Sequence, residues 1–321
     1  MKSDVKYSLL MALAAFIWGT AFVAQRMGAG ILDAFSFNSV RSFIGALALI
    51  PVVLTMGRQE AISQLATRQG RFSLLIGGLS CGIILTVSTL FQQVGLEGTT
   101  AGKAGFITAL YILIVPLIGL VFGKRVSLPV WLAVAIALFG MYCLCIKEGF
   151  TIERGDRMVL FCAFCFSCHI LAIDHFVKRV DPIMLSAVQF FFCGIFSLVP
   201  FSWKAAQLPE VSQIVACWKP ILYTAVFSSA VAYTLQIITQ KHLAPAVASI
   251  VMSLESVFAA LSGWAVLGEH LSLRELMGCV LVFVATILAQ VPMEENSKNF
   301  LVDFFSSIKK RLPKTKKKGS L

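Results

Sequence analysis

The chain has 321 residues, of which 58% are hydrophobic and only 13% are charged. A soluble domain would carry about 25% charged residues, so a single water-soluble core cannot accommodate this composition. The net charge of +11 does not indicate nucleic-acid binding, because the Lys and Arg residues gather at the end of the chain and in short segments between apolar runs. The composition predicts an integral membrane protein with no nucleic-acid partner.

The elements predicted along the chain are apolar helices. A helix needs about 20 residues to cross the hydrocarbon of a bilayer, and no run shows the alternating pattern of a barrel strand. The first run is longer than the apolar part of a signal peptide, so we expect it to be retained. The ten predicted spans are residues 7–25, 36–56, 73–93, 99–122, 127–147, 158–174, 183–203, 220–240, 246–267 and 273–290.

The basic residues outside the spans predict the orientation of the chain. If the N-terminus is inside, the cytoplasmic loops hold ten Lys and Arg residues and the opposite loops hold seven. The eight Lys and Arg residues from Lys298 onward join the cytoplasmic set, so both termini are predicted to be cytoplasmic. The same tail reads as an amphipathic stretch followed by KTKKK, which would either contact anionic lipid headgroups or stay solvated.

The chain also contains an internal repeat. VFGKRVSL, between the fourth and fifth spans, aligns with VLGEHLSL between the ninth and tenth, and LDAFSFNSVRSF aligns with VDPIMLSAVQFF. Each half holds five spans, an odd number, so the halves insert in opposite orientations. Inverted repeats are typical of transporters, which bind substrate near the midplane where the halves meet. We therefore predict an all-α membrane protein with repeats at residues 7–147 and 155–290 and a basic tail at 291–321.

Ionisable side chains at bilayer depth cost about 2.5–3.5 kcal/mol and indicate function. Glu255 lies near the middle of the ninth span, whereas Lys103 and Arg41 lie in the outer parts of the fourth and second. Two interpretations of Glu255 stay open. In one, it faces a central cavity and exchanges a proton, since burial favours the uncharged carboxyl, or contacts a cationic group of the substrate. In the other, it is permanently paired with Lys103 or Arg41 and holds helices together.

The repeat alignment supplies further candidates for a substrate site. Tyr111 falls opposite Glu255, which predicts a contact between a phenol and a carboxylate near the two-fold axis. Gln92 falls on Gln236, and these amides would line a polar cavity or link helices to one another. Two aromatic residues could likewise form the cavity wall or only pack helices, namely Trp18 and Tyr233.

Two motifs are interpreted as packing features. The GxxxG spacing of Gly98 with Gly102, and of Gly119 with Gly123, predicts close approach of helices. The run FCAFCFSCH, from Cys162 to His169, has a C-x2-C-x2-C spacing like that of iron–sulfur ligands. On an apolar helix its sulfurs form a slanted ridge that does not converge on one ion. We expect this run to pack against other helices, with no metal and no cofactor.

The stretches FIWGTAF, GKAGFITALY and LESVFAALSGWAVLGEHLS resemble the EamA family of the drug/metabolite transporter superfamily. The resemblance covers residues 7–290 and implies a ten-helix carrier of the bacterial plasma membrane. Many members of this family export metabolites or amino acids. Lys124 stands where the family often has Glu, although Glu269 is kept, and Ser256 stands where Pro often follows the Glu of the ninth span. These departures weaken any transfer of a substrate from relatives.

Together these features predict a secondary transporter that exports a small-molecule substrate by alternating access, with proton coupling through Glu255 as one option. No GxxxxGK[ST] motif appears, so ATP is not the expected energy source. One alternative is a flippase for a lipid or a lipid-linked sugar on the same fold. Another is an intramembrane enzyme, but His169 is the only histidine well inside a span, and an inverted repeat has no evident use in an enzyme. We therefore expect a protein that is not an enzyme.

Overall fold

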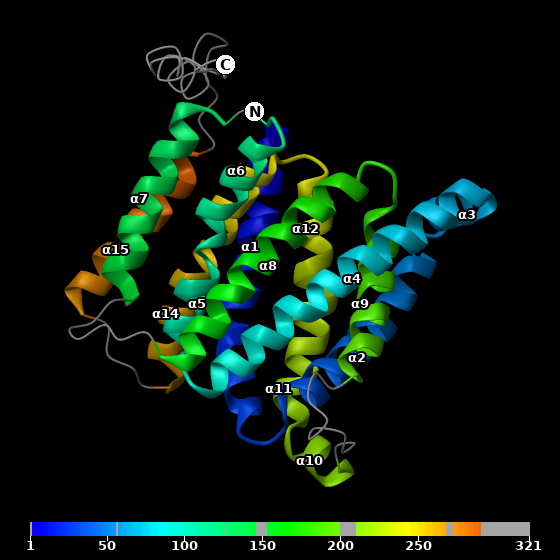
Figure 1. The fold of residues 1–321 in the computed structure, drawn as a ribbon, viewed down its shortest axis with the longest axis horizontal. Helices are drawn as coiled ribbons and strands as arrows, with labels where there is room; N and C mark the ends of the chain where they lie inside the picture. The colour runs from blue at the N-terminus through cyan, green and yellow to red at the C-terminus, as the bar shows by residue number, and fades with distance from the viewer. Residues whose placement is uncertain are drawn as a thin grey trace, which may run out of the picture.

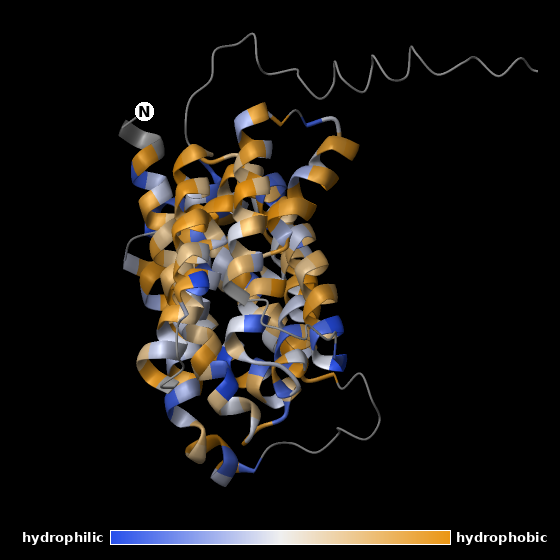
Figure 2. Ribbon diagram, turned by 90° about the vertical axis from the view of Figure 1, so that its left-hand side faces the viewer, coloured by the Kyte–Doolittle hydropathy of each residue, from blue (hydrophilic) through white to orange (hydrophobic). Residues whose placement is uncertain are grey.

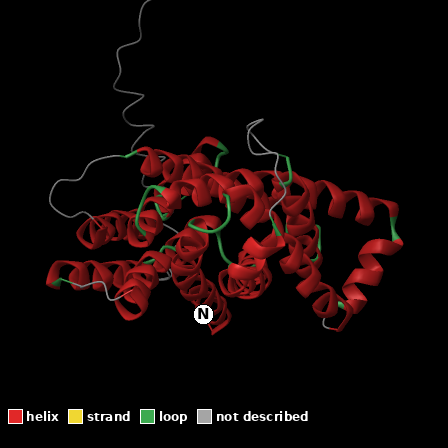
Figure 3. Cartoon of the chain, turned by 90° about the horizontal axis from the view of Figure 1, so that it is seen from below, coloured by secondary structure: helices red, strands yellow, loops and turns green. Residues whose placement is uncertain are grey.

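A computed structural model describes residues 2–55, 57–124, 126–145, 153–199, 210–267 and 272–289, so the predicted tail at 291–321 lies outside the described residues. All regular structure in these residues is helical (Figures 1 and 3). Apolar residues cover much of the sides of the helix bundle in Figure 2, where they would face lipid chains.

The described residues form a succession of helices joined by short connections. In chain order the helices are α1 (Lys2–Ala29), α2 (Ala34–Thr55), α3 (Arg58–Ala66), α4 (Arg68–Glu97), α5 (Ala101–Thr108), α6 (Tyr111–Val121), α7 (Leu128–Cys145), α8 (Arg154–Phe176), α9 (Pro182–Ser197), α10 (Val211–Ala216), α11 (Trp218–Tyr223), the π-helical η1 (Thr224–Ala232), α12 (Tyr233–Gln240), α13 (Pro245–Met252), α14 (Leu254–Leu267) and α15 (Leu273–Leu288).

Seven helical segments within the described residues are long and apolar enough to cross a membrane, so the protein is a multi-pass membrane protein. The other three predicted spans coincide with α7, α9 and α15, which have 18, 16 and 16 residues. The short helices α3 and α10, in the connections, were not predicted. The seven segments are Val5–Ala29, Ala34–Thr55, Arg68–Glu97, Ala101–Val121, Arg154–Phe176, Trp218–Gln240 and Pro245–Val266.

Two of the predicted spans are interrupted rather than continuous. The fourth is split into α5 and α6 by a turn at Ala109 and Leu110, and the ninth into α13 and α14 by a turn at Ser253. When Tyr111 is aligned with Glu255, the two interruptions fall at matching positions in the two halves. Broken helices at matched positions are typical of transporter binding sites, because the freed backbone can line a cavity.

The eighth predicted span also departs from a regular α-helix. Its middle third, η1, has π-helical hydrogen bonding between α11 and α12. Such segments are rare and occur frequently at functional sites. The seventh predicted span extends to residue 203, whereas α9 ends at Ser197.

Helices from the two halves pack against one another in matching pairs. The second spans of the two halves, α2 and α9, pack against each other, and so do the fifth spans, α7 and α15. The first helix, α1, runs through the middle of the bundle and packs along α13 and α14 (Figure 1). The core is therefore shared between the halves rather than built separately in each.

The GxxxG prediction is largely wrong. Gly98 does lie close to Gly155 of α8, but a Cβ added at Gly102 or Gly123 would meet no atom within 4 Å. Gly123 has a φ of +74° and follows the end of α6, where the amide of Lys124 donates to the carbonyl of Gly119. This backbone conformation favours glycine at a helix C-terminus, so the spacing there reflects a helix end rather than helix packing.

Candidate functional site

A small cavity lined by both polar and apolar side chains lies between the two halves of the bundle. Its volume is about 30 Å³, which leaves room for only one or two water molecules. Seven of the eight predicted site residues line it, and Lys103 does not. The lining residues are Trp18, Phe22, Gln25, Arg41, Gln92, Thr108, Tyr111, Phe166, Ser228, Tyr233, Gln236, Met252 and Glu255.

Glu255 and Tyr111 meet across the interface between the halves. The Tyr111 hydroxyl donates to Oε1 of Glu255 at 2.8 Å, which confirms the predicted phenol–carboxylate contact. Both side chains are buried, and each follows the interruption in its broken helix. At the second interruption the hydroxyl and the backbone amide of Ser256 both donate to the carbonyl of Ser253.

Arg41 lines the same cavity but does not pair with Glu255. Its Nε donates to Oδ1 of Asn38 at 2.9 Å and its Nη1 to Oε1 of Gln25 at 3.2 Å. Asn38 in turn donates to the Ser197 hydroxyl at 2.8 Å, which connects α2 to α9. The predicted Glu255–Arg41 pair is therefore wrong, because the guanidinium donates to two amide oxygens and forms no ion pair with Glu255.

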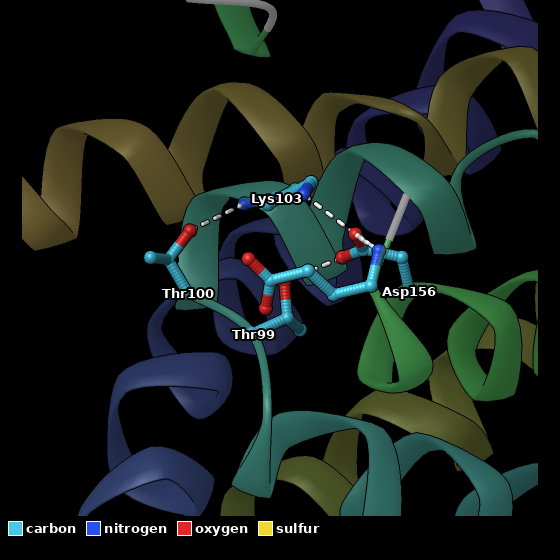
Figure 4. A network of polar contacts seen from close by, with 5 residues as sticks. Thr99, Thr100, Lys103 and Asp156 are labelled. Atoms are coloured by element: carbon cyan, nitrogen blue, oxygen red, sulfur yellow. Dashed lines mark hydrogen bonds and ion pairs between the residues drawn. The ribbon is translucent and has the colours of Figure 1, made fainter. Parts of the chain in front are cut away.

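Lys103 pairs with Asp156 rather than with Glu255 (Figure 4). Its ammonium lies 2.5 Å from Oδ2 of Asp156, the buried carboxylate at the start of α8, and Thr99 donates to the other oxygen at 2.8 Å. The predicted Glu255–Lys103 pair is thus wrong. Lys103 lies in the first turn of α5 and its side chain reaches α8 rather than the cavity.

Two polar atoms of the cavity wall have no hydrogen-bond partner among the described residues. They are Nε1 of Trp18, a donor, and Oε1 of Gln236, an acceptor, and both are buried. The matching glutamine of the first half, Gln92, donates to the Thr108 hydroxyl at 3.3 Å. A buried polar atom without a partner is unfavourable, so these two atoms favour a polar occupant in the cavity.

Aromatic rings close one side of the cavity. Trp18 meets Tyr233 edge to face, with ring centroids 4.9 Å apart, and Tyr233 also contacts Phe190 at 5.2 Å. Edge-to-face packing of this kind holds both rings in place. The two predicted aromatic candidates, Trp18 of the first half and Tyr233 of the second, thus contact each other.

The cysteine run of α8 lies behind this wall and packs as predicted. Cys162 and Cys165 are buried, and Nε2 of His169 lies 3.1 Å from Oε1 of Gln189 on α9. In the described part of the chain, no group of three or more His, Cys, Asp or Glu side chains lies close enough to share a metal ion.

Six residues of the cavity were not predicted, and the repeat indicates three of them. The register that matches Tyr111 with Glu255 also matches Thr108 with Met252, and both line the cavity. The alignment of the second span with the seventh can be extended to the first and sixth spans. It then matches Trp18 with Phe166, which also lines the cavity. The repeat does not match the other three unpredicted lining residues with a cavity residue of the opposite half, and these are Phe22, Gln25 and Ser228.

A buried cavity with polar side chains between two matching halves, flanked by broken helices, is the arrangement in which secondary transporters bind substrate. Both halves match the model of the EamA-like transporter family, over residues 5–146 and 153–290. The chain belongs to that family and is a membrane transporter of its kind.

Relatives with curated descriptions agree with this assignment. An uncharacterised transporter of Archaeoglobus fulgidus is 33% identical over 288 residues, which cover 88% of this chain and 84% of the relative. The uncharacterised transporter YwfM of Bacillus subtilis is 26% identical over 90% of this chain and 94% of its own length. A protein of known crystal structure shares the fold with a TM-score of 0.68 at 18% identity, over 89% of this chain and 96% of that one.

Proposed function

We propose that the protein is a proton-coupled secondary transporter that exports a small metabolite, such as an amino acid, across the plasma membrane by alternating access. In this proposal ten helices cross the membrane and both termini are cytoplasmic. The observation that carries it is Glu255, a buried carboxylate in the cavity between the halves, whose partner there is the neutral hydroxyl of Tyr111. No described cation forms an ion pair with it.

Such a carboxylate can bind and release a proton during the transport cycle. The Tyr111 hydroxyl stabilises the ionised form, whereas removal from water favours the protonated form, so a change in water access alters the balance between them. If protonation and solute binding at Glu255 exclude one another, proton entry drives solute exit. The neutral phenol allows this exchange because it can stay in contact with either form.

The size of the cavity supports a closed state of the cycle. A volume of about 30 Å³ is too small for a metabolite, so the helices must separate to admit one. The interruptions at Ala109–Leu110 and at Ser253 are places where the ends of the broken helices can tilt. We expect these two turns to open the cavity to one side and then to the other.

Glu255→Gln tests the proposal, because it keeps the shape of the side chain and removes its charge and its titration. Metabolites inside and outside cells that express each variant are compared by mass spectrometry, at several external pH values. Wild type is expected to export one solute or a small group of solutes in a pH-dependent manner, and Glu255→Gln is expected to lose both the export and its pH dependence.

The matched control is Glu60→Gln, a change to an exposed glutamate of α3. It should leave export unchanged, and the amount of folded protein in the membrane is measured for every variant by size-exclusion chromatography. If Glu255→Gln folds and exports with the pH dependence of the wild type, Glu255 does not couple transport to protons.

A further inference from the structure

Arg41 is a buried cation without an acidic partner. Only 4% of its surface is exposed, and its hydrogen-bond acceptors are the neutral side-chain oxygens of Asn38 and Gln25. None of the described carboxylates forms an ion pair with it. An unneutralised charge within the membrane is costly, so a site that keeps one has a use for it.

The neutral oxygens around Arg41 hold the guanidinium without neutralising it. Nε and Nη1 are occupied by Asn38 and Gln25, and Asn38 is itself fixed by the Ser197 hydroxyl. A guanidinium has five N–H groups, so donors remain for a further acceptor. Because Arg41 lines the cavity, an anion that occupied the cavity could reach them.

The other charges and orphaned polar atoms of the cavity indicate what this anion is attached to. Among the lining residues Arg41 is the only Lys or Arg and Glu255 the only acid. The unpartnered N–H of Trp18 can donate to a second oxygen of an anion, and the unpartnered Oε1 of Gln236 can accept from an N–H group. The cavity therefore offers both donors and acceptors to one solute.

We propose that the solute carried by this protein bears a carboxylate group and that Arg41 binds it. The inference rests on the proposed transport function and names the chemical class of its substrate. A guanidinium binds a carboxylate through paired, charge-assisted hydrogen bonds, and the geometry suits a planar anion. An amino group on the same solute would find acceptors in Glu255 and Gln236.

A single carboxylate fits the charge of the cavity better than a phosphate does. With Glu255 ionised, the form that binds solute in the proposed cycle, the cavity is neutral and matches a zwitterion; with Glu255 protonated, the form that has released the solute, the cavity carries one positive charge. A phosphate dianion would leave uncompensated negative charge in either state. Phosphate sites also gather several donors or a helix N-terminus, whereas the cavity has one cationic side chain.

The test measures binding to the purified full-length protein in lipid nanodiscs, by the rise of the melting temperature with ligand concentration. The probes are the common L-amino acids and short-chain monocarboxylates, each compared with its primary amide and with its phosphonate analogue. At least one carboxylate is expected to bind about tenfold or more tightly than its amide, because the amide lacks the charge-assisted hydrogen bonds. The phosphonate dianion is expected to bind more weakly than the carboxylate.

Arg41→Gln should remove the preference for the acid over the amide, and Arg41→Lys should keep part of it. Glutamine suits this position because the repeat alignment places Gln189 opposite Arg41. The matched control is Arg26→Gln, on α1, because the exposed Arg26 donates to the carbonyl of Leu96 and does not line the cavity. It should leave the preference unchanged.

The inference is overturned if no carboxylate of the panel stabilises the wild type, if acid and amide stabilise it equally, or if a folded Arg41→Gln protein keeps the preference. If Arg41→Gln does not fold, the acid–amide comparison in the wild type and in Arg41→Lys decides. A failure of the transport proposal looks different. It would appear as a carboxylate that binds with the expected preference but does not cross the membrane of proteoliposomes containing the protein.

Discussion

The backbone of Gly19 on α1 lies directly against the backbone of Glu255 on α14. A Cβ atom added at Gly19 would lie 2.8 Å from the carbonyl oxygen of Glu255 and 2.8 Å from the amide nitrogen of Ala259. It would also overlap Cβ of Phe258. The absence of a side chain at Gly19 thus lets the helix that carries the central carboxylate pack onto the first helix of the other half.

Gly19→Ala is therefore expected to destabilise the protein. The methyl group has no room to move away from backbone atoms, so α1 and α14 must separate slightly, at a cost of about 1–3 kcal/mol. The measurement is the melting temperature of the purified protein. Gly30→Ala is the control, since a Cβ there would meet nothing within 4 Å, and an equal effect of the two changes would contradict the close approach.

The position of Tyr111 opposite Glu255 could be predicted because the repeat fixes depth in the membrane. Residues that align in two inverted halves lie at matched depths on either side of the two-fold axis, and both follow the interruption of a broken helix. This reasoning needs only the spacing of residues along the chain. It is also what brought Gln92 and Gln236 into the same prediction, whereas Trp18 and Tyr233 were predicted as aromatic residues within their spans.

The pairing of the charged residues could not be predicted in this way. The depth of Lys103 gives its distance from the membrane surface, but it does not determine which neighbouring helix the side chain faces. Asp156 carries no signal of this role in the sequence, because it lies just before the predicted sixth span, where a carboxylate is ordinarily solvated. Arg41 binds amide oxygens, and nothing in the spacing distinguishes an amide partner on α1 or one turn away from an acidic partner on α14.

Removing Lys103 and removing the charge of Asp156 should destabilise the protein to different extents. Lys103→Met leaves a buried carboxylate that still accepts from Thr99 and from the amide of Glu153, but lacks a counter-charge. Asp156→Asn removes the charge instead, and a fifth of the Lys103 side chain is already exposed. We expect Lys103→Met to lower the free energy of unfolding by about 1–3 kcal/mol and Asp156→Asn by less.

The control for this prediction is Lys178→Met. Lys178 lies 3.5 Å from Asp174, but 63% of its side chain is exposed and Asp174 keeps Lys124 as a second partner, so we expect the loss of Lys178 to cost about 0–1 kcal/mol. Melting temperatures of the three variants are compared in the same detergent. Equal losses for Lys103→Met and Lys178→Met would show that Lys103 stabilises Asp156 no more than an exposed lysine stabilises a carboxylate that has a second cation.

The ten-span proposal makes a prediction about topology. Reporters that are active only in the cytoplasm or only outside it are fused to each terminus and inserted within residues 146–152. We expect cytoplasmic signals at both termini and an external signal at the insertion, because five spans separate it from each terminus. Termini on opposite sides of the membrane would contradict ten spans.

Tyr111 and Glu255 should act as a unit in transport. Tyr111→Phe removes only the hydroxyl that donates to Oε1 of Glu255, and a hydrogen bond to a charged group contributes about 1.5–3 kcal/mol. We expect it to slow export of the solute identified by metabolite profiling about tenfold or more. Export is already lost in the Glu255→Gln background, so the coupling is measured on the melting temperature, where the same change should have little further effect because the carboxylate that the hydroxyl donates to is gone. Tyr142→Phe, a change to a half-exposed tyrosine of α7, is the control, and additive losses in the double variant would show that Tyr111 acts independently of Glu255.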